Sequence, residues 1–134
     1  MIRIEEELFT KVATALRSEF PDIYVSGEYV SQPPPFPAVF IQEMENSVNR
    51  ATRDTGGIEN FADVMYQVDV YTNRTKLRKS QAKDIMDVVD GEFAKLGFTR
   101  SFLNPVPNMD DATIYRLTGR WVATVSKDNT VYRR

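Results

Sequence analysis

The chain has 134 residues and a formal net charge of −2, from 17 Lys and Arg against 19 Asp and Glu. It contains neither Cys nor His, which excludes disulfides and thiolate ligands and removes the commonest general base and the commonest nitrogen ligand of metals. The slightly acidic balance argues against broad electrostatic attraction to nucleic acid or anionic lipid, and the length suits a single domain over residues 1–134.

The N-terminal segment predicts an amphipathic helix of about four turns. Large apolar residues recur at steps of four from Ile4 to Phe20, and glutamates at 5–7 favour the positive end of the helix dipole. Pro21 cannot continue the helix. This start lacks the pattern of a signal peptide, and no segment approaches the roughly 20 apolar residues that span a bilayer, so we expect a soluble cytoplasmic protein.

The next part of the chain predicts two short strands joined by a rigid connector. Residues 23–30 form the first strand, with a bend or bulge at Gly27. The proline-rich run 32–37 is stiff and extended, and we expect a connector here in preference to a ligand for a proline-binding groove. Residues 38–45 then alternate, with Val39 and Ile41 on one strand face.

A long polar segment, residues 46–60, separates this strand from the next one. Because a connection of this length is uncommon in a compact domain and strands flank it directly, a long hairpin arm is the economical geometry. Such an arm would order against a partner, and a surface loop without a role is the alternative. The residues that we expect to make the contacts are Asn49, Arg50, Arg53, Asp54, Gly56, Gly57 and Glu59.

Residues 61–98 change from a strand period to a helical period. Alternate residues over 64–70 are apolar and would face one side of a strand. After a cap at Asn73 or Thr75, apolar residues recur at steps of three and four along a second helix, which ends at a left-handed cap on Gly97. The single apolar stripe implies a helix packed on a sheet.

The remaining chain predicts two more strands. Residues 98–103 alternate, and residues 112–126 form a long strand with Leu117 and Trp121 on its core side and a basic opposite side. Residues 127–134 form a turn followed by a short edge strand or a tail. The order αβββαββ predicts an α+β domain: a mainly antiparallel sheet with two helices packed on one face, and a long hairpin arm.

The sheet face turned away from the helices is a candidate subunit interface. It is polar without uniform charge, and apolar residues such as Met65 and Val122 interrupt it. A plain solvent-facing surface is the alternative. The residues that we expect to contact a partner on this face are Gln67, Asp69, Tyr71, Arg116 and Arg120.

No pattern in the sequence predicts catalysis. Three acidic pairs could serve as acid and base: Glu43 with Glu45 on one strand face, Asp110 with Asp111 in a loop, and Asp87 with Asp90 on a helix. No recognisable motif flanks any of them, and the sequence has no phosphate-binding glycine motif and no metal-ligand spacing. We therefore expect a protein without catalytic residues, cofactor, metal or small-molecule substrate.

A cluster of cations opens the second predicted helix, namely Arg74, Lys76, Arg78, Lys79 and Lys83. Together with the face that carries Arg116 and Arg120, the cluster could serve a small nucleic-acid-binding α+β module, which is one alternative function. A solvated helix face is the favoured interpretation because acidic residues follow the cluster and the whole chain is acidic. We expect no sequence-specific binding of nucleic acid.

Several segments together resemble a known family, namely PPPFPAVFIQEMEN, YQVDVYTN, KDIMDVVDGEFAKLGF, RLTGRWVATV and VYRR. Their order and the chain length are similar to those of the tail terminator, or tail-to-head joining, proteins of long-tailed bacteriophages. The resemblance implies a non-enzymatic protein of the virion tail or neck, assembled in the bacterial cytoplasm without a membrane partner.

The same resemblance implies what such a protein would bind. Its subunits would form a homo-oligomeric ring, commonly a hexamer, that stops growth of the tail tube and docks onto the head–tail connector. DNA would pass through the ring without being read. Another neck or head-completion protein of a phage is the close alternative.

Overall fold

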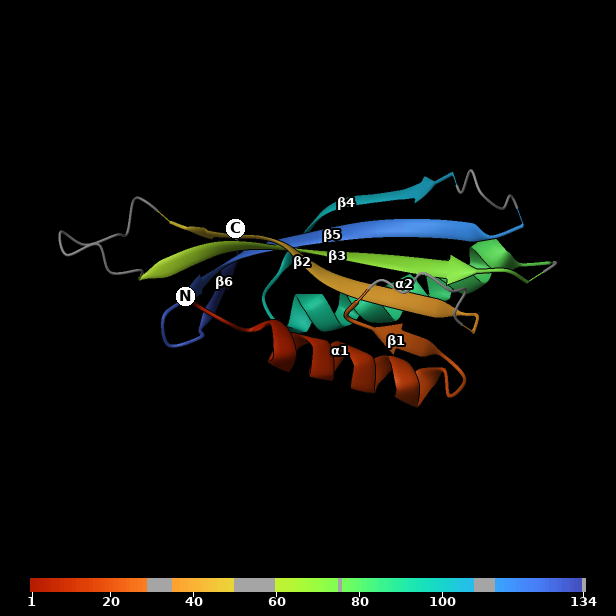
Figure 1. Cartoon of the computed structure of the whole chain (residues 1–134), viewed down its shortest axis with the longest axis horizontal. Helices are drawn as coiled ribbons and strands as arrows, with labels where there is room; N and C mark the ends of the chain where they lie inside the picture. The colour runs from red at the N-terminus through yellow and green to blue at the C-terminus, as the bar shows by residue number, and fades with distance from the viewer. Residues whose placement is uncertain (29–34, 50–59, 75, 108–112, 134) are drawn as a thin grey trace.

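The computed structural model describes residues 1–28, 35–49, 60–74, 76–107 and 113–133. The helices and strands within them follow the order α1 (Glu5–Glu19), β1 (Tyr24–Ser26), β2 (Ala38–Val48), β3 (Phe61–Thr72), α2 (Arg78–Lys95), β4 (Thr99–Val106), β5 (Tyr115–Ser126) and β6 (Val131–Arg133). Figure 1 shows both helices on one side of an elongated sheet. The predicted α+β class with one helical layer is confirmed.

The sheet is antiparallel except at one edge. Its strand order is β1-β2-β3-β5-β4, and β1 runs parallel to β2 over a short ladder from Tyr24↔Ala38 to Ser26↔Phe40. Two strands share the outer edge of β5, because β4 pairs with residues 116–122 and β6 pairs with residues 123–125. The C-terminal segment is therefore an edge strand, one of the two options that the sequence left open.

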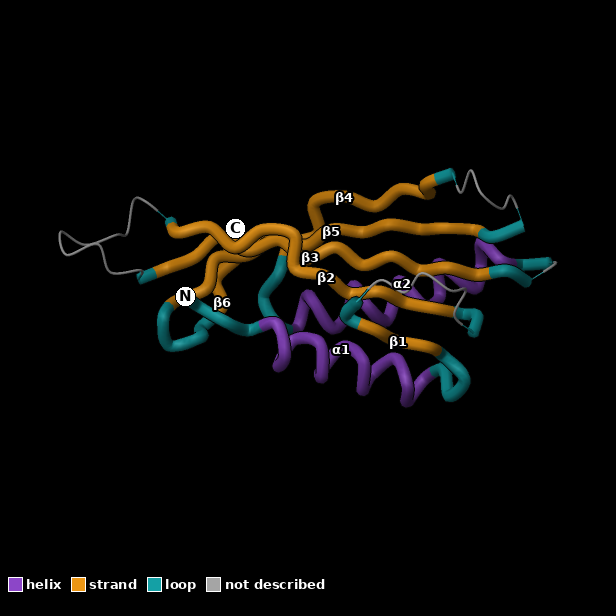
Figure 2. Tube along the Cα trace, viewed as in Figure 1, coloured by secondary structure: helices purple, strands orange, loops and turns teal. Residues whose placement is uncertain are grey.

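One apolar core lies between the sheet and the helices. α1 buries Leu8, Val12 and Leu16 at the predicted steps of four, and Figure 2 shows α1 and α2 against the same face of the sheet. From β3 the core takes alternate residues from Val64 to Val70, which confirms the predicted strand face. Full burial of a large aliphatic side chain contributes about 1.5–3 kcal/mol, so this alternation fixes which face of β3 meets the helices.

Trp121 on β5 is the largest fully buried side chain of the core. Its ring stacks on Phe93 of α2, with 4.7 Å between centroids and an interplanar angle of 11°. Its indole N–H donates to Asp90 Oδ1 at 3.0 Å. A Cβ atom on Gly119 would lie 2.5 Å from the indole, so the strand needs glycine there for the ring to lie flat. Trp121 packs in the core, as its predicted strand face indicates.

α2 begins without the side-chain cap that the sequence predicted. The residue before its first turn is Leu77, which has a left-handed φ of 65° and offers no capping side chain. The Thr72 hydroxyl instead donates to the Arg78 carbonyl oxygen at 2.9 Å and ties the end of β3 to the helix. The predicted cap at Asn73 is wrong, and the other candidate, Thr75, lies outside the described residues.

The end of α2 follows the prediction. Gly97 has a left-handed φ of 92°. The Phe98 N–H donates to the Phe93 carbonyl oxygen at 2.9 Å and the Gly97 N–H donates to the Ala94 carbonyl oxygen at 3.1 Å, the two bonds of a Schellman motif. The rings of Phe98 and Phe93 meet edge to face at 5.3 Å, so the hydrophobic contact of this cap belongs to the core.

β2 and β3 form the base of the predicted hairpin arm. Their ladder continues to the pair Val48↔Ala62, and beyond it the Asn49 N–H donates to the Phe61 carbonyl oxygen at 2.9 Å. Both strands are longer than an average strand, and in Figure 1 this end of the hairpin extends past the start of α1. The remaining residues expected to form the arm, 50–59, lie outside the described residues.

Candidate interaction surface

The sheet face opposite the helices carries a polar network centred on Asp69. This carboxylate is 5% exposed. Its Oδ1 accepts a hydrogen bond from Arg116 Nε at 3.1 Å and another from the Thr118 hydroxyl at 2.5 Å, while Arg116 Nη2 lies 3.1 Å from the same oxygen. Its Oδ2 accepts from Gln67 Nε2 at 3.0 Å. Asp69 therefore joins three side chains from two neighbouring strands.

The network extends across the face through a second arginine. Gln67 Oε1 accepts from Arg120 Nε at 3.0 Å, and the Arg120 guanidinium lies 4.9 Å from the centre of the Phe102 ring. On the other side, the Arg116 guanidinium lies 5.6 Å from the centre of the Tyr71 ring. The structure thus brings together the five residues expected to contact a partner on this face, joins to them Thr118, which strand alternation also places there, and adds Phe102.

The electrostatics of the network explain why it is ordered. A buried carboxylate is costly unless it is paired and hydrogen-bonded, and Asp69 satisfies both conditions. The Arg116 side chain remains 30% exposed although it is held by that carboxylate. Since these side chains are fixed within the isolated chain, a partner would not have to immobilise them, which lowers the entropic cost of binding.

Phe40 is a part of this face that the sequence did not single out. It is 4% exposed and lies between two tyrosine rings, 6.2 Å from Tyr24 and 5.6 Å from Tyr71, both edge to face. Because side chains alternate along β2, Phe40 points to the face away from Val39, so the sequence could predict its face. Its partners were not, because Tyr24 comes from the short parallel strand β1.

A second, smaller group of polar contacts lies where the arm leaves the sheet. Asp63 Oδ1 accepts from the Thr124 hydroxyl at 2.8 Å and from Asn49 Nδ2 at 3.4 Å. Asn49 is thus anchored to β3. The other residues expected in the arm lie outside the described residues: Arg50, Arg53, Asp54, Gly56, Gly57 and Glu59.

The first candidate acid pair does not share a strand face as predicted. The register of β2 shifts between Glu43 and Glu45, so that Glu43 lies opposite Tyr66 and Glu45 lies opposite Met65. Neighbouring residues of β3 point to opposite faces, and the two glutamates therefore do so as well. The sequence could not show this shift, because an irregularity in β2 breaks the two-residue alternation.

The two other candidate pairs are not assembled for acid/base work either. Asp90 binds the Trp121 indole and lies 3.1 Å from Arg100 Nη1, which makes it a structural residue, whereas Asp87 is exposed. Asp110 and Asp111 lie outside the described residues.

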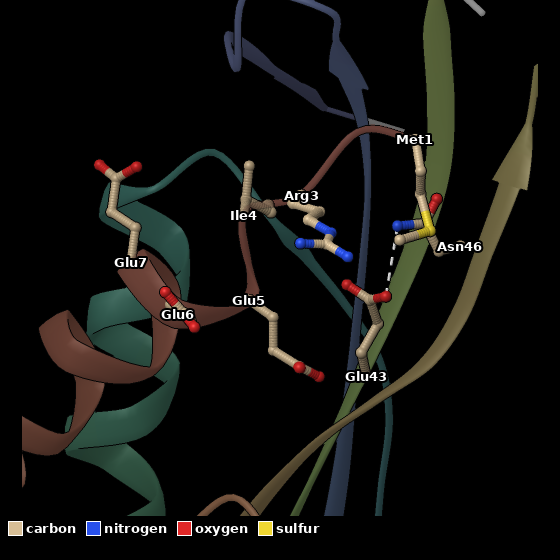
Figure 3. A pocket seen from close by; sticks show the side chains of 8 residues that line it. All are labelled: Met1, Arg3, Ile4, Glu5, Glu6, Glu7, Glu43 and Asn46. Atoms are coloured by element: carbon tan, nitrogen blue, oxygen red, sulfur yellow. Dashed lines mark hydrogen bonds between the residues drawn. The ribbon is translucent and has the colours of Figure 1, made fainter.

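A cavity of about 440 Å³ lies between the N-terminal segment and β2 (Figure 3). The side chains of Arg3, Glu5 and Glu43 point toward the same space in this view, and Asn46 Nδ2 donates to Glu43 Oε1 at 3.2 Å. The hydroxyl of the buried Tyr66 also donates to the Glu43 carboxylate. Burial, and then the neighbouring Glu43 carboxylate, raise the pKa of Tyr66 well above its usual range, so this phenol stays protonated and cannot act as a base.

Two classes of site receive no support from the residues that the structure describes. Among them there is no group of three or more acidic side chains placed to hold a metal ion. Neither described helix combines the length and the apolar composition needed to cross a membrane. The polar network on the open sheet face is the best-formed candidate surface on this part of the chain.

Comparison with known proteins adds no relative to this description. No family model matches the chain, and no curated protein matches it.

Proposed function

We propose that this chain is a non-enzymatic structural protein of a phage or prophage particle, whose subunits form a ring that terminates the tail tube and joins the tail to the head connector. The observation that carries the proposal is the ordered network around Asp69 on a sheet face that no described helix covers. It is a surface with fixed donors, and it lies on the side of the sheet away from the core.

The two arginines of this network retain binding capacity. A guanidinium has five N–H donors. Contacts with other described residues engage Nε and Nη2 of Arg116, and Nε of Arg120. The remaining donors suit carboxylate or carbonyl oxygens of an adjoining subunit, and planar donors of this kind are enriched at protein interfaces.

The hairpin of β2 and β3 supports the second element of the proposal. A ring requires contact between two different surfaces of each subunit, because identical patches generate only closed pairs. The sheet face would be one such surface. The arm that begins at Asn49 would be the other, ordering against a neighbour or against the tail tube.

The remaining features of the proposal come from the resemblance described above. The ring would be a hexamer located in the neck of the virion and assembled in the host cytoplasm. Its partners would be the tail tube protein and the head–tail connector. The net charge of −2 is compatible with a channel through which DNA passes without strong attraction to its phosphates.

The direct test of this function is tube termination. Tail tube protein from the same genome is polymerised with and without the purified chain, and tube lengths are measured by negative-stain electron microscopy. We expect the chain to stop elongation and to leave extra density at one tube end. The double variant Arg116→Ala and Arg120→Ala should lose this effect, whereas Lys11→Ala, which removes an exposed cation on α1, should retain it. Unchanged tube growth in the presence of the wild-type chain would contradict the proposal.

One observation favours the alternative of a nucleic-acid-binding module. Arg116 is paired opposite Tyr71, close to the end of β3, and the basic cluster that starts at Arg74 follows that end directly. Arg116 and the basic cluster are therefore at the same end of the sheet, whereas Arg120 lies opposite Gln67 in the middle of β3. A protein that remained monomeric and bound DNA with a steep salt dependence would support this alternative in place of the ring.

A further inference from the structure

The connection between β3 and α2 presents an apolar side chain among cations. Leu77 is 68% exposed and has a left-handed φ of 65°. This conformation is uncommon for residues other than Gly, Asn and Asp, and exposure leaves an apolar side chain in water. The conformation is nevertheless held on both sides, because the Gln81 N–H donates to the Leu77 carbonyl oxygen and Thr72 binds the Arg78 carbonyl oxygen, each at 2.9 Å.

Three exposed cations flank this leucine in the sequence, and we call the group the basic knob: Arg74, Lys76, Leu77 and Lys79. None of the three cations forms an ion pair with another residue that the structure describes. The knob therefore combines an apolar centre with a positive rim, and the fold supplies neither a cover for the leucine nor a counter-charge for the rim among these residues. A surface of this composition suits an apolar site with an acidic rim.

A groove of that description lies elsewhere on the same chain. It has a volume of about 630 Å³ and runs between α1 and the sheet edge where β1 ends. We call it the acidic groove, and its lining is Glu5, Glu6, Phe9, Thr10, Arg17, Val25, Ser26, Gly27, Glu28 and Ile41. The half-buried Phe9 gives it an apolar wall, above the buried Val25 and Ile41, and its three carboxylates outnumber its one cation.

Two features of the described residues shape this groove. The described ladder between β1 and β2 ends at Ser26↔Phe40, so β1 does not continue along β2 beyond that pair. Gly27 follows, and a Cβ atom there would lie 3.8 Å from both the Phe9 ring and the Ile41 carbonyl oxygen. Glycine thus leaves free the space that a larger side chain at position 27 would fill.

We propose that the basic knob of one subunit docks in the acidic groove of a second copy of this chain. Leu77 would lie against the half-buried Phe9 ring, and the knob cations would face Glu6 and Glu28. The knob lies where β3 passes into α2, at the right-hand end of Figure 1. The groove is lined instead by residues of α1 and of the sheet edge near the end of β1. The contact is therefore heterologous, the type that closes into rings. The inference rests on the proposed function and supplies one of its subunit contacts.

The test uses two opposite charge reversals in the full chain. The knob-reversed variant carries Lys76→Glu and Lys79→Glu, and the groove-reversed variant carries Glu6→Lys and Glu28→Lys. We expect the concentration of half-assembly, measured by light scattering, to rise at least tenfold for each variant alone. An equimolar mixture should assemble as the wild type does, because each reversed surface then meets its complement. The control variant with Lys95→Glu and Lys127→Glu has the same charge change as the knob reversal, away from both surfaces, and should assemble normally.

A cysteine pair provides a second readout that does not depend on reversed charges. The chain has no natural Cys. Leu77→Cys in one chain and Thr10→Cys in another should be joined by a short bismaleimide when the two single variants are mixed, and neither variant should form dimers alone. Leu77→Cys mixed with Ser101→Cys on β4 should give no product.

The possible outcomes separate this contact from the proposed function. A wild-type chain that forms rings, with reversed variants that assemble equally well and no link between positions 77 and 10, would overturn the contact alone. A wild-type chain that stays monomeric would overturn both. Reversed variants that still form rings but lose DNA binding or tube termination would assign the knob to a different partner and would also overturn the contact.

Discussion

Arg116 on β5 reaches diagonally across the sheet to Asp69 on β3, and both its Nε and its Nη2 lie 3.1 Å from the same carboxylate oxygen. Thr118 and Gln67 complete the coordination of that carboxylate. A sheet face exposed only to water does not need a buried carboxylate of this kind, since a polar uncharged residue would be less costly there. The arrangement is expected where a face must keep arginines in fixed positions.

The first prediction concerns the stability that Asp69 contributes. Asp69→Ala leaves Arg116 without its counter-charge and should lower the free energy of unfolding by about 2–3 kcal/mol. This lies below the roughly 3–5 kcal/mol of fully buried pairs because Arg116 is 30% exposed. Urea denaturation measures the change in the free energy of unfolding. The control is Asp63→Ala, which removes the half-buried carboxylate that binds Thr124 and Asn49 and should cost about 1 kcal/mol. Equal losses of unfolding free energy in the two variants would show that the Asp69 network stabilises the fold no more than the contacts of Asp63 do.

The second prediction compares two glycines in different surroundings. Gly119→Ala puts a methyl group 2.5 Å from the fully buried Trp121 indole and should destabilise the fold by about 1–3 kcal/mol. The methyl group that Gly91→Ala adds in α2 would meet no atom within 4 Å outside its own turn of helix. This variant should stabilise the fold by about 0.5–1 kcal/mol through helix propensity. Thermal unfolding of both variants tests the stacking geometry of Trp121, and a neutral Gly119→Ala would contradict it.

The third prediction concerns alkaline pH. The folded chain raises the pKa of Tyr66 above its usual range, so the unfolded chain loses this proton first. The contribution of the protonated Tyr66 hydroxyl to the free energy of unfolding is therefore complete below a pH of about 10, the pKa in the unfolded chain. Above that pH the free energy of unfolding falls by about 1.4 kcal/mol for each pH unit. Tyr66→Phe should reduce the slope of the free energy of unfolding against pH in that range, while Tyr132→Phe, at an exposed position, is the control. An unchanged slope in Tyr66→Phe would refute the burial of this hydroxyl.

The fourth prediction concerns the arm. Deleting Asn49–Gly57 leaves the four residues 58–61 between the ladder partners Val48 and Ala62, a length that hairpins commonly use. The thermal midpoint should stay close to that of the wild type, and assembly should be abolished. Light scattering and thermal unfolding are measured on the same sample. Normal assembly of the deleted chain would mean that the segment is only a surface loop.

Alternation and periodicity were sufficient to predict most of the fold. The apolar steps of α1, the two faces of β3 and the cap at Gly97 depend on residues close together in the sequence, and each follows from local chemistry. The start of α2 was not predictable in the same way, because Leu77 takes a left-handed conformation without any side-chain signal. The opposite faces of Glu43 and Glu45 depend on a register shift that no residue type announces.

The candidate interaction surface was likewise predictable only in part. The members of the open face could be predicted, since Gln67, Asp69 and Arg116 follow from strand alternation alone. Their bonds could not, because diagonal contacts depend on the register between β3 and β5. The acidic groove was also beyond sequence reasoning, as its walls come from α1, β1 and β2 and meet only in the folded chain.

The central claim, a ring of identical subunits, is tested most directly by the mass of the purified full-length chain in solution. Light scattering after size exclusion should give about 92 kDa, six times the 15.4 kDa chain, over a range of concentrations. Negative-stain images of that peak should show closed rings. A single species of 15.4 kDa at every concentration would contradict the account.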